Sequence, residues 1–242
     1  MASTTQHEPI NDIECPVALI KSNLILIPTP IAISSPSYRA FYASLHANTS
    51  FCEMGFGEHF KARSWTDEET YEIISTRDVN NDWRNRGVGD FAVGLLEPED
   101  HKRILGDNAV TRNISVPGIS EDEQIRVLDT GRESLALEEI EWVGYAGVRQ
   151  ARDVDRIPSW KDKVEIRYGV SPNHWGKRIA NRSAEVVMDW AVAEKGVTKF
   201  IATTERANAR SGRILGKLGF VQLEEAKYWK EDPTEFEWER IV

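Results

Sequence analysis

Apolar and polar residues alternate most clearly in the last third of the chain. From Val164 to Val170 every second residue is apolar, which predicts a strand with one apolar face and one polar face. Apolar residues then recur at helical spacing from Ile179 to Ala191, and Gly196 is positioned to end that helix. The remaining pattern predicts a strand at 200–203, a short helix at 208–218, and strands at 221–227 and 236–242.

The first half of the chain carries fewer clear elements. An apolar run before Pro28 predicts a buried strand at 24–28 that is ended by its proline. Apolar residues spaced i, i+3, i+4 and i+7 after Ser37 predict a helix with Ser37 as its cap. Thr66 and Glu69 have the spacing of a capping box and predict a second helix. Further strands are predicted at 91–96 and 140–148.

These elements predict one α/β (α+β) domain over residues 22–242, preceded by a flexible N-terminal tail at 1–21. An acidic segment at about 97–138 interrupts the domain, with ten Asp and Glu residues against five Lys and Arg. Long loops inside compact domains are usually working lids or solvated insertions. Acidic sequence with little periodicity favours the solvated insertion, and the lid remains the alternative.

Composition and charge restrict the partners more than the fold. The 242 residues carry a formal net charge of -9, which argues against nucleic acid or an anionic membrane as the main partner. A cationic substrate such as an amine fits better, although an acidic balance also keeps a protein soluble. Cys15 and Cys52 cannot make a disulfide framework, and no His or Cys spacing predicts a metal site. With no signal segment or membrane span in the sequence, a cytoplasmic protein is expected.

The segment between the strand at 164–170 and the helix that begins at Ile179 carries the clearest chemistry. Backbone N–H groups at a helix start attract anions, and Gly176 allows an anion to approach the chain closely. A diphosphate is the natural ligand for such a loop. Lys177, Arg178 and Arg182 would add positive charge, although each is also an ordinary surface residue.

This loop and the elements after it resemble the GNAT superfamily of acetyl-CoA-dependent N-acetyltransferases, and within it the RimJ/RimL-like branch. The resemblance is specific over about residues 140–229 and rests on three groups of residues: Pro172, Trp175 and Gly176; Asn208 and Ser211; and Lys217, Gly219 and Phe220. It implies a mixed, mostly antiparallel sheet that is flanked by helices and splayed at its central strands.

The resemblance also implies where acetyl-CoA, the cosubstrate, would bind. Its pantetheine arm would lie in the splay and pair with free strand backbone near Gly169, Val170 and Ser171. Its diphosphate would lie on the loop that contains Trp175, Gly176, Lys177, Arg178, Ile179 and Ala180. Asn208 and Lys217 complete the expected cofactor-binding set, and no metal is expected.

Three positions depart from the family pattern. Asn173 stands where Gln or Arg is usual, and Arg178 stands where a second Gly or Ala is usual. Arg182 replaces a Glu that is often found early in the helix. Either the added positive charges compensate for the imperfect loop, or the cofactor site is damaged.

Acetyl transfer to an amine requires a proton acceptor, because an amine with a pKa near ~10 is protonated at neutral pH. Glu165, on the polar face of its strand, is the candidate, and its alternative role is an ion pair with Arg167 or a neighbour. The departing thiolate requires a proton donor. Many GNAT enzymes have a tyrosine where this chain has Leu215. In the RimJ/RimL-like branch the serine of the Asn-x-x-Ser segment resembles its replacement, which nominates Ser211. Tyr228 is a fallback, and its alternative role is in a packed strand end.

Together these features predict an N-acetyltransferase that moves an acetyl group from acetyl-CoA to a primary amine by direct transfer. The alternative is a non-catalytic acyl-CoA-binding or scaffolding protein with the same fold. The expected acceptor is a small-molecule amine or a peptide N-terminus with net positive charge. We expect no nucleic-acid or membrane partner, and a monomer or a homodimer.

Overall fold

The computed structural model describes residues 7, 10–57, 59–106, 109–114, 124–151, 161, 164–229 and 232–242. Within these residues, ten strands form one sheet in the order β4-β5-β1-β2-β3-β6-β7-β8-β10-β9. The strands are β1 (Ala18–Lys21), β2 (Leu24–Pro28), β3 (Asp90–Leu95), β4 (Thr111–Ile114), β5 (Ile125–Leu128), β6 (Glu141–Gln150), β7 (Val164–Val170), β8 (Lys199–Glu205), β9 (Val221–Gln222) and β10 (Glu235–Ile241). The helices are α1 (Thr29–Ala32), α2 (Pro36–Ala47), α3 (Thr49–Phe56), α4 (Asp67–Ile74), α5 (Arg84–Arg86), α6 (His101–Leu105), α7 (Ile179–Lys195) and α8 (Ala209–Lys217), with a π-helical segment at Ser75–Trp83 between α4 and α5.

The sheet splits at one place. Neighbouring strands run antiparallel, except for β7 and β8, which run parallel. Among the described residues, these two strands pair only where Val164 and Glu165 face Phe200 and Ile201. Beyond Glu165 they diverge, so the rest of β7 is paired with β6 but not with β8. This confirms the predicted mixed, mostly antiparallel sheet that is splayed at its central strands.

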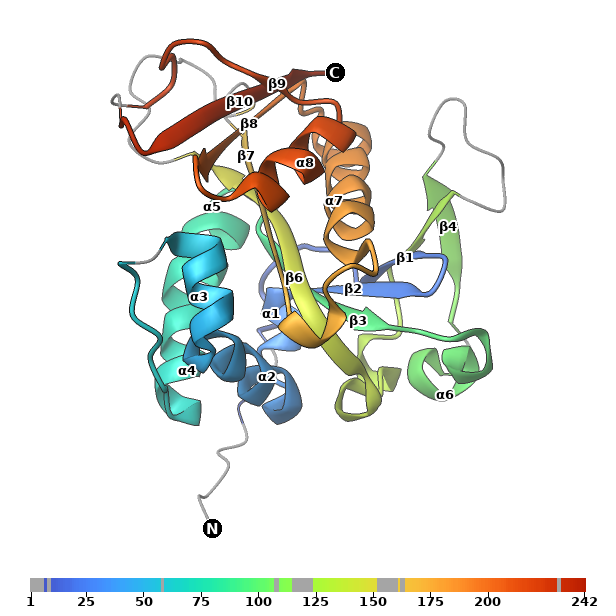
Figure 1. Cartoon of the computed structure of the whole chain (residues 1–242). Coiled ribbons are helices and arrows are strands. Elements are labelled where there is room, and N and C mark those ends of the chain that lie inside the picture. Colours follow the sequence, from blue (N-terminus) through green and yellow to red (C-terminus); the bar gives the residue numbers. More distant parts are fainter. Residues whose placement is uncertain are drawn as a thin grey trace.

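Helices cover both faces of the sheet beside the splay (Figure 1). α7 packs against β6 and β7 through a buried stripe that includes Ala184, Val187 and Ala191, which confirms the predicted amphipathic helix. Gly196 follows it with a φ of 65°, a left-handed conformation that glycine adopts without strain and that ends a helix. On the other side of β6, α2 packs against α4 and β6.

The predicted tail at 1–21 is wrong for its second half. Ile13 and Val17 are buried, and Ala18–Lys21 forms β1, which lies between β5 and β2 in the sheet. Leu19 and Ile20 are fully buried there. Their burial removes apolar surface from water at roughly 25 cal/mol per Å², which anchors this segment to the domain. Residues 1–6, 8 and 9 lie outside the described part of the chain.

The acidic segment at 97–138 contributes to the sheet instead of forming one long loop. It holds α6, and β4 and β5 extend the sheet at one edge. β5 pairs with both β1 and β4, and its Ile125, Val127 and Leu128 are buried. These apolar residues explain the pairing, because a strand with a buried face is held by its side chains as well as by its hydrogen bonds. Residues 107, 108 and 115–123 lie outside the described residues.

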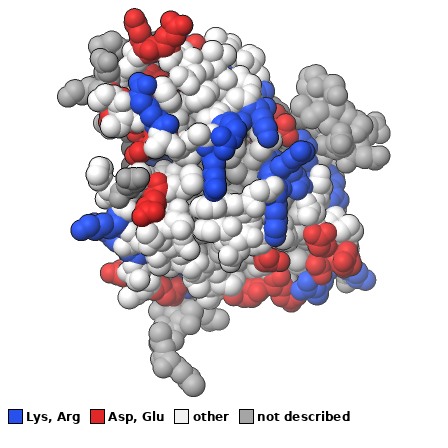
Figure 2. Space-filling model, viewed as in Figure 1, with Lys and Arg blue, Asp and Glu red and all other residues white. Residues whose placement is uncertain are grey.

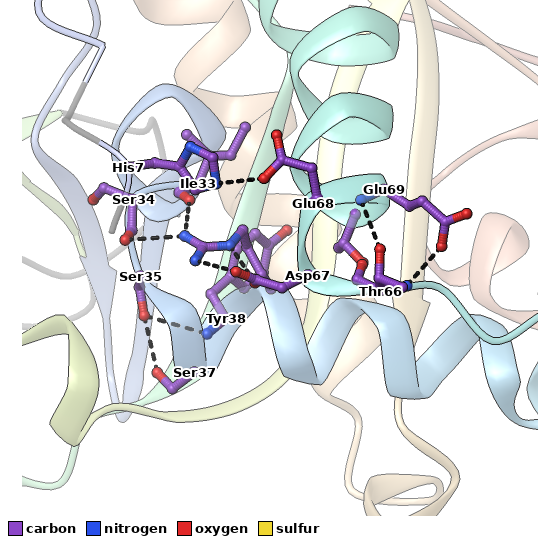
Figure 3. Close-up of polar contacts among 12 residues, drawn as sticks. His7, Ile33, Ser34, Ser35, Ser37, Tyr38, Thr66, Asp67, Glu68 and Glu69 are labelled. Carbon is purple, nitrogen blue, oxygen red and sulfur yellow. Dashed lines mark hydrogen bonds and ion pairs between the residues drawn. The ribbon is translucent and has the colours of Figure 1, made fainter. Parts of the chain in front are cut away.

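Local signals at the helix starts are largely confirmed. Thr66 and Glu69 make the reciprocal hydrogen bonds of the predicted capping box, as Figure 3 shows. α2, however, is capped by Ser35 and not by Ser37, because Pro36 occupies the first helical position, where its missing N–H costs nothing. Ser37 instead accepts a hydrogen bond from the indole of Trp142 at 3.1 Å. Among the described residues, none of the helices combines the length and the hydrophobicity that crossing a membrane requires.

Candidate active site

A cavity of about 1390 Å³ opens where β7 and β8 diverge. It extends from the loop before α7 and from α8 on one side to α2, α3 and the segment after α4 on the other. The predicted site residues that line it are Glu165, Gly169, Val170, Trp175, Gly176, Arg178, Ile179, Ala180, Asn208, Ser211 and Lys217. Ser171 and Lys177 do not line it, and neither do the described residues of the acidic segment at 97–138.

One half of the cavity is positively charged. We define this cationic half as the lining residues within 174–181 and 208–217. They include Arg178, Arg210, Arg213 and Lys217 but no carboxylate. Figure 2 shows Lys and Arg side chains gathered around α8 and the start of α7. Such a surface attracts a multiply charged anion and stabilises it once it is bound.

The start of α7 points unpaired backbone amides at this half. No side chain caps the helix, and its first residues Ile179, Ala180 and Asn181 line the cavity. The first N–H groups of a helix have no partner inside it and carry the positive end of the helix dipole. The predicted anion-binding loop therefore has both features that a phosphate requires, namely free N–H donors and nearby guanidinium groups.

Two positive φ angles shape the loop before α7. Gly176 has a φ of 82°, and a Cβ added to it would meet nothing within 4 Å, so an anion can approach freely. Arg178 has a φ of 61°, a left-handed conformation that costs a residue with a side chain roughly 1–2 kcal/mol. This strain explains why Gly suits that position in the pattern which the sequence resembles, because glycine has no Cβ.

Trp175 fixes the loop to the end of β7. Its indole nitrogen donates a hydrogen bond to the carbonyl oxygen of Val170 at 2.8 Å, and the guanidinium of Arg210 lies 5.0 Å from its ring centroid. The amide of Ser171 donates to the carbonyl of Val143 at 2.9 Å. The expectation of free strand backbone over residues 169–171 is therefore wrong for these two groups, because the tryptophan and β6 already satisfy them.

Arg182 does not contribute to the cationic half, contrary to the expectation from sequence. Its guanidinium donates to the side-chain oxygen of Asn23 at 2.7 Å, which directs it toward the turn between β1 and β2. Lys177 is exposed on the loop. The cations that replace these two in the cavity are Arg210 and Arg213 on α8, which the sequence analysis did not select. Their three-residue spacing on one helix was the available signal.

Ser211 lies at the start of α8 and touches β7. Asn208 caps α8 by accepting the Ser211 amide at 3.0 Å, and its side-chain nitrogen donates to the Met54 carbonyl. The Ser211 hydroxyl lies 2.7 Å from the hydroxyl of Tyr168, and both residues line the cavity. Burial raises the pKa of Tyr168 to about 12, although its hydrogen bond with Ser211 acts in the opposite direction. The sequence analysis placed Tyr168 only on the apolar face of its strand.

Glu165 is held by an arginine on the neighbouring strand. Arg149, which faces Glu165 across β6 and β7, donates two hydrogen bonds to its carboxylate, at 2.7 and 3.0 Å. The expected ion pair therefore forms with this neighbour and not with Arg167, which instead bonds Asp90 at 2.7 Å. Cross-strand register decides the partners, because residues two apart on one strand lie further apart than a directly opposed pair.

Buried polar side chains from α1, the π-helical segment and β3 line the cavity. Asp78, on the π-helical segment, accepts hydrogen bonds from the Thr29 hydroxyl and, at 2.8 Å, from the Asp90 amide. Burial, and then the negative charge of Asp90, raise the pKa of Asp78 well above its usual range. π-Helical segments are rare and often lie at functional sites. No pattern in the sequence had pointed to Asp78 or Asp90.

Metal-ligand residues do not cluster in the part of the chain that the structure describes. No group of three or more His, Cys, Asp or Glu side chains is placed there to hold an ion.

Tyr228, the fallback proton donor, bonds Glu239 on β10 and does not line the cavity. This arrangement matches the packed strand end that was its alternative role.

Comparison with known proteins places these features in a family context. A family model described as an acetyltransferase (GNAT) domain matches residues 36–221. An acetyltransferase from Agrobacterium tumefaciens has a similar structure, with a TM-score of 0.57, 16% identity, and coverage of 93% of this chain and 94% of the other.

Two further similar structures are complexes with coenzyme A. One is RimL, a ribosomal L7/L12 alpha-N-protein acetyltransferase in complex with coenzyme A (TM-score 0.53, 12% identity, 92% and 96% coverage). The other is a spermidine N-acetyltransferase from Vibrio cholerae in complex with CoA and spermine (TM-score 0.51, 11% identity, 90% and 95% coverage). At these identities the structural likeness shows the shared fold.

Proposed function

Because the chain belongs to the GNAT family of acetyl-CoA-dependent acetyltransferases, over residues 36–221, we propose that it transfers an acetyl group to a primary amine by direct attack. The observation that carries the proposal is the cavity at the splay. It joins the uncapped start of α7, the four cations of the cationic half and the hydroxyl pair of Tyr168 and Ser211. A bound amine would attack the thioester there without a covalent enzyme intermediate.

The cationic half would hold acetyl-CoA. The amides of Ile179, Ala180 and Asn181 would receive the diphosphate, and Arg178, Arg210, Arg213 and Lys217 would neutralise the phosphate charges. The pantetheine arm would lie beside the part of β7 from which β8 has diverged. Holding the thioester and the amine in one orientation itself lowers the barrier substantially.

Two proton transfers complete the proposed reaction. The amine nitrogen forms a bond to the acetyl carbon while the bond from that carbon to sulfur breaks. The proton that the amine loses passes to the Glu165 carboxylate, directly or through water. The thiolate takes the Ser211 hydroxyl proton, and Tyr168, a stronger acid than an aliphatic alcohol, returns a proton to Ser211 across their hydrogen bond.

Charge supports a cationic acceptor. Away from the cationic half, the cavity is lined by four carboxylates, Asp90, Glu165, Glu205 and Glu235, by Asp78, whose pKa is raised by burial, and by three guanidinium groups, Arg77, Arg149 and Arg167. Glu205 and Glu235 face each other directly on β8 and β10, which is unfavourable for like charges unless a cation lies nearby. Such a field raises the local concentration of protonated amines.

Release of free CoA thiol in the presence of acetyl-CoA and a panel of amines and short peptides tests the proposal. Turnover with at least one amine is expected, together with acetyl-CoA binding measured by calorimetry. Binding without turnover across the panel would instead support the non-catalytic alternative. In that case Arg178, with its strained backbone, and Leu215 would be the first residues to substitute in order to restore turnover.

A further inference from the structure

Aromatic rings line the half of the cavity that lies beneath α2 and α3. Tyr42, His46, Phe51, Phe56 and Tyr145 all line it, and we call these five the aromatic chamber. Their rings form a continuous set. The ring centroid of His46 lies 4.7 Å from that of Tyr42 and 5.7 Å from that of Phe56, and the ring centroids of Tyr42 and Tyr145 lie 6.1 Å apart. Rings at these separations attract one another, and their faces attract cations.

The chamber adjoins the strand beside which the thioester is proposed to lie. A Cβ added to Gly169 would lie 2.6 Å from the Tyr145 ring and 2.9 Å from Phe51. Glycine at this position therefore lets the rings pack directly on β7. An acceptor that fills the chamber reaches the proposed reaction site along the same strand.

A carboxylate with one free oxygen lies in the same half. Asp90 is 4% exposed, and one of its oxygens accepts from Arg167 at 2.7 Å. The other, Oδ1, is buried and has no hydrogen-bond partner among the described residues. A buried acceptor without a partner costs roughly 1–3 kcal/mol. Asp90 forms an ion pair with Arg167, whereas burial raises the pKa of the neighbouring Asp78.

His46 adds a second unpartnered acceptor. It is 6% exposed, and within the described part of the chain neither of its ring nitrogens has a hydrogen-bond partner. Burial, and then the positive charges of Arg167 and Arg77, lower its pKa to about 4. The imidazole is therefore neutral near pH 7 and offers one lone pair without adding a positive charge that would repel a cation.

These groups share one ligand preference. A carboxylate oxygen, the acceptor nitrogen of a neutral imidazole and aromatic faces all attract a protonated amine, and the carboxylate and the ring faces repel an anion. Arg167, whose guanidinium lies 5.5 Å from the centroid of the Tyr145 ring, is already bonded to the other oxygen of Asp90. The chamber is therefore suited to an ammonium group on a hydrocarbon chain.

Strand register separates this ammonium from the nitrogen that is proposed to be acetylated. Asp90, Gly147 and Arg167 form one row across β3, β6 and β7, and Tyr145 and Gly169 belong to a row two residues further along. Two residues of a strand span about 7 Å. A protonated nitrogen at Asp90 also cannot attack a thioester, because it has no lone pair. Short extended diamines span such a distance.

We infer that the aromatic chamber binds a second, protonated nitrogen of the acceptor against Asp90, so that the acceptor is a diamine or a polyamine. This inference rests on the proposed acetyltransferase function. It adds Asp90 as a residue that determines which amine is used, with His46 and the other rings as the walls of its site.

A matched pair of substrates tests the inference on the full chain. We would measure kcat/KM for 1,4-diaminobutane and for 1-aminobutane, which have the same carbon chain but differ in the second nitrogen. The parent should prefer the diamine by about tenfold or more, which corresponds to about 1.4 kcal/mol. Asp90→Asn should reduce that ratio to about twofold or less. The ratio does not depend on the fraction of folded enzyme, so partial misfolding cannot imitate the result.

Two further variants keep the test decisive. His46→Phe retains an aromatic ring but removes both nitrogens, and it should lower the ratio several-fold even if Asp90→Asn does not fold. Asp82→Asn changes a buried carboxylate on the same π-helical segment that does not line the cavity, and it should leave the ratio unchanged.

The possible failures are distinguishable. If both amines are acetylated equally by the parent, or if Asp90→Asn and His46→Phe keep the parental ratio, the inference is wrong while the proposed function stands. If no amine releases CoA although acetyl-CoA binds, the proposed function itself is wrong.

Discussion

The hydroxyl oxygens of Tyr168 and Ser211 lie 2.7 Å apart, although one residue belongs to β7 and the other to α8. β7 is splayed away from β8, and Asn208 holds the start of α8 by accepting the Ser211 amide. The pair therefore joins α8 to the part of β7 that is no longer paired with β8, and both residues line the cavity. It also brings a phenol close to Ser211 in a chain that has leucine at position 215.

Removing either hydroxyl should slow turnover without weakening the binding of acetyl-CoA. We expect Ser211→Ala to lower kcat by about 10²-fold, within the usual contribution of a positioned proton donor, and Tyr168→Phe to lower it by a smaller factor. The double variant should be no slower than Ser211→Ala alone, because Tyr168 acts through the serine. Additive losses, or an equal loss of acetyl-CoA affinity measured by calorimetry, would contradict this relay.

A negative charge in the loop before α7 should weaken acetyl-CoA binding. We expect Gly176→Asp to raise the Kd at least about tenfold, since it places a carboxylate beside the uncapped helix start and strains a backbone with a φ of 82°. Gly131→Asp is the matched control, because Gly131 has a φ of 83°, also has open space around it and does not line the cavity. Equal affinities for the two variants would show that the diphosphate lies elsewhere.

The role of Glu165 can be separated from its ion pair with Arg149. If the carboxylate accepts the amine proton, Glu165→Gln should lower kcat by about 10²-fold, whereas Arg149→Met, which keeps the carboxylate, should retain most of the activity. Arg149→Met removes both hydrogen bonds to Glu165, whereas Glu165→Gln can keep one through its amide oxygen, so Arg149→Met should lower thermal stability at least as much. Equal activities for the two would leave Glu165 with a structural role only.

Stability should fall with rising pH because of Asp78. Its folded-state pKa is raised by burial and by Asp90, so above the ordinary pKa of about 3.9 the folded chain holds this proton more tightly than the unfolded chain. Between that pH and the raised pKa of Asp78 in the folded chain, the parent loses up to about 1.4 kcal/mol of unfolding free energy per pH unit from this group. Asp78→Asn removes the titration, so its advantage over the parent should be greater at pH 8 than at pH 5 in urea unfolding. A difference that does not change with pH would show that Asp78 titrates normally.

Local patterns in the sequence determined the elements whose interactions lie within a few residues. The capping box of Thr66 and Glu69 spans one helical turn, and the alternation from Val164 to Val170 needs only the period of a strand. The loop with Trp175 and Gly176 before α7 was also legible, because a helix start and a glycine specify where an anion can approach.

Only the tertiary structure decided which distant segments meet. β1 is too short to be recognised alone, and it is stabilised by pairing with β5, more than 100 residues later in the chain. The bonds from Glu165 to Arg149 and from Tyr168 to Ser211 depend on strand register and on the path of α8, which no local period encodes. The same holds for Asp78 and Asp90, whose environment arises from burial among segments that are separated in sequence. The sequence by itself therefore determined the loop before α7 and the helix that follows it. The groups proposed to handle protons, and the aromatic chamber, became visible only in the fold, because long-range packing brings their members together.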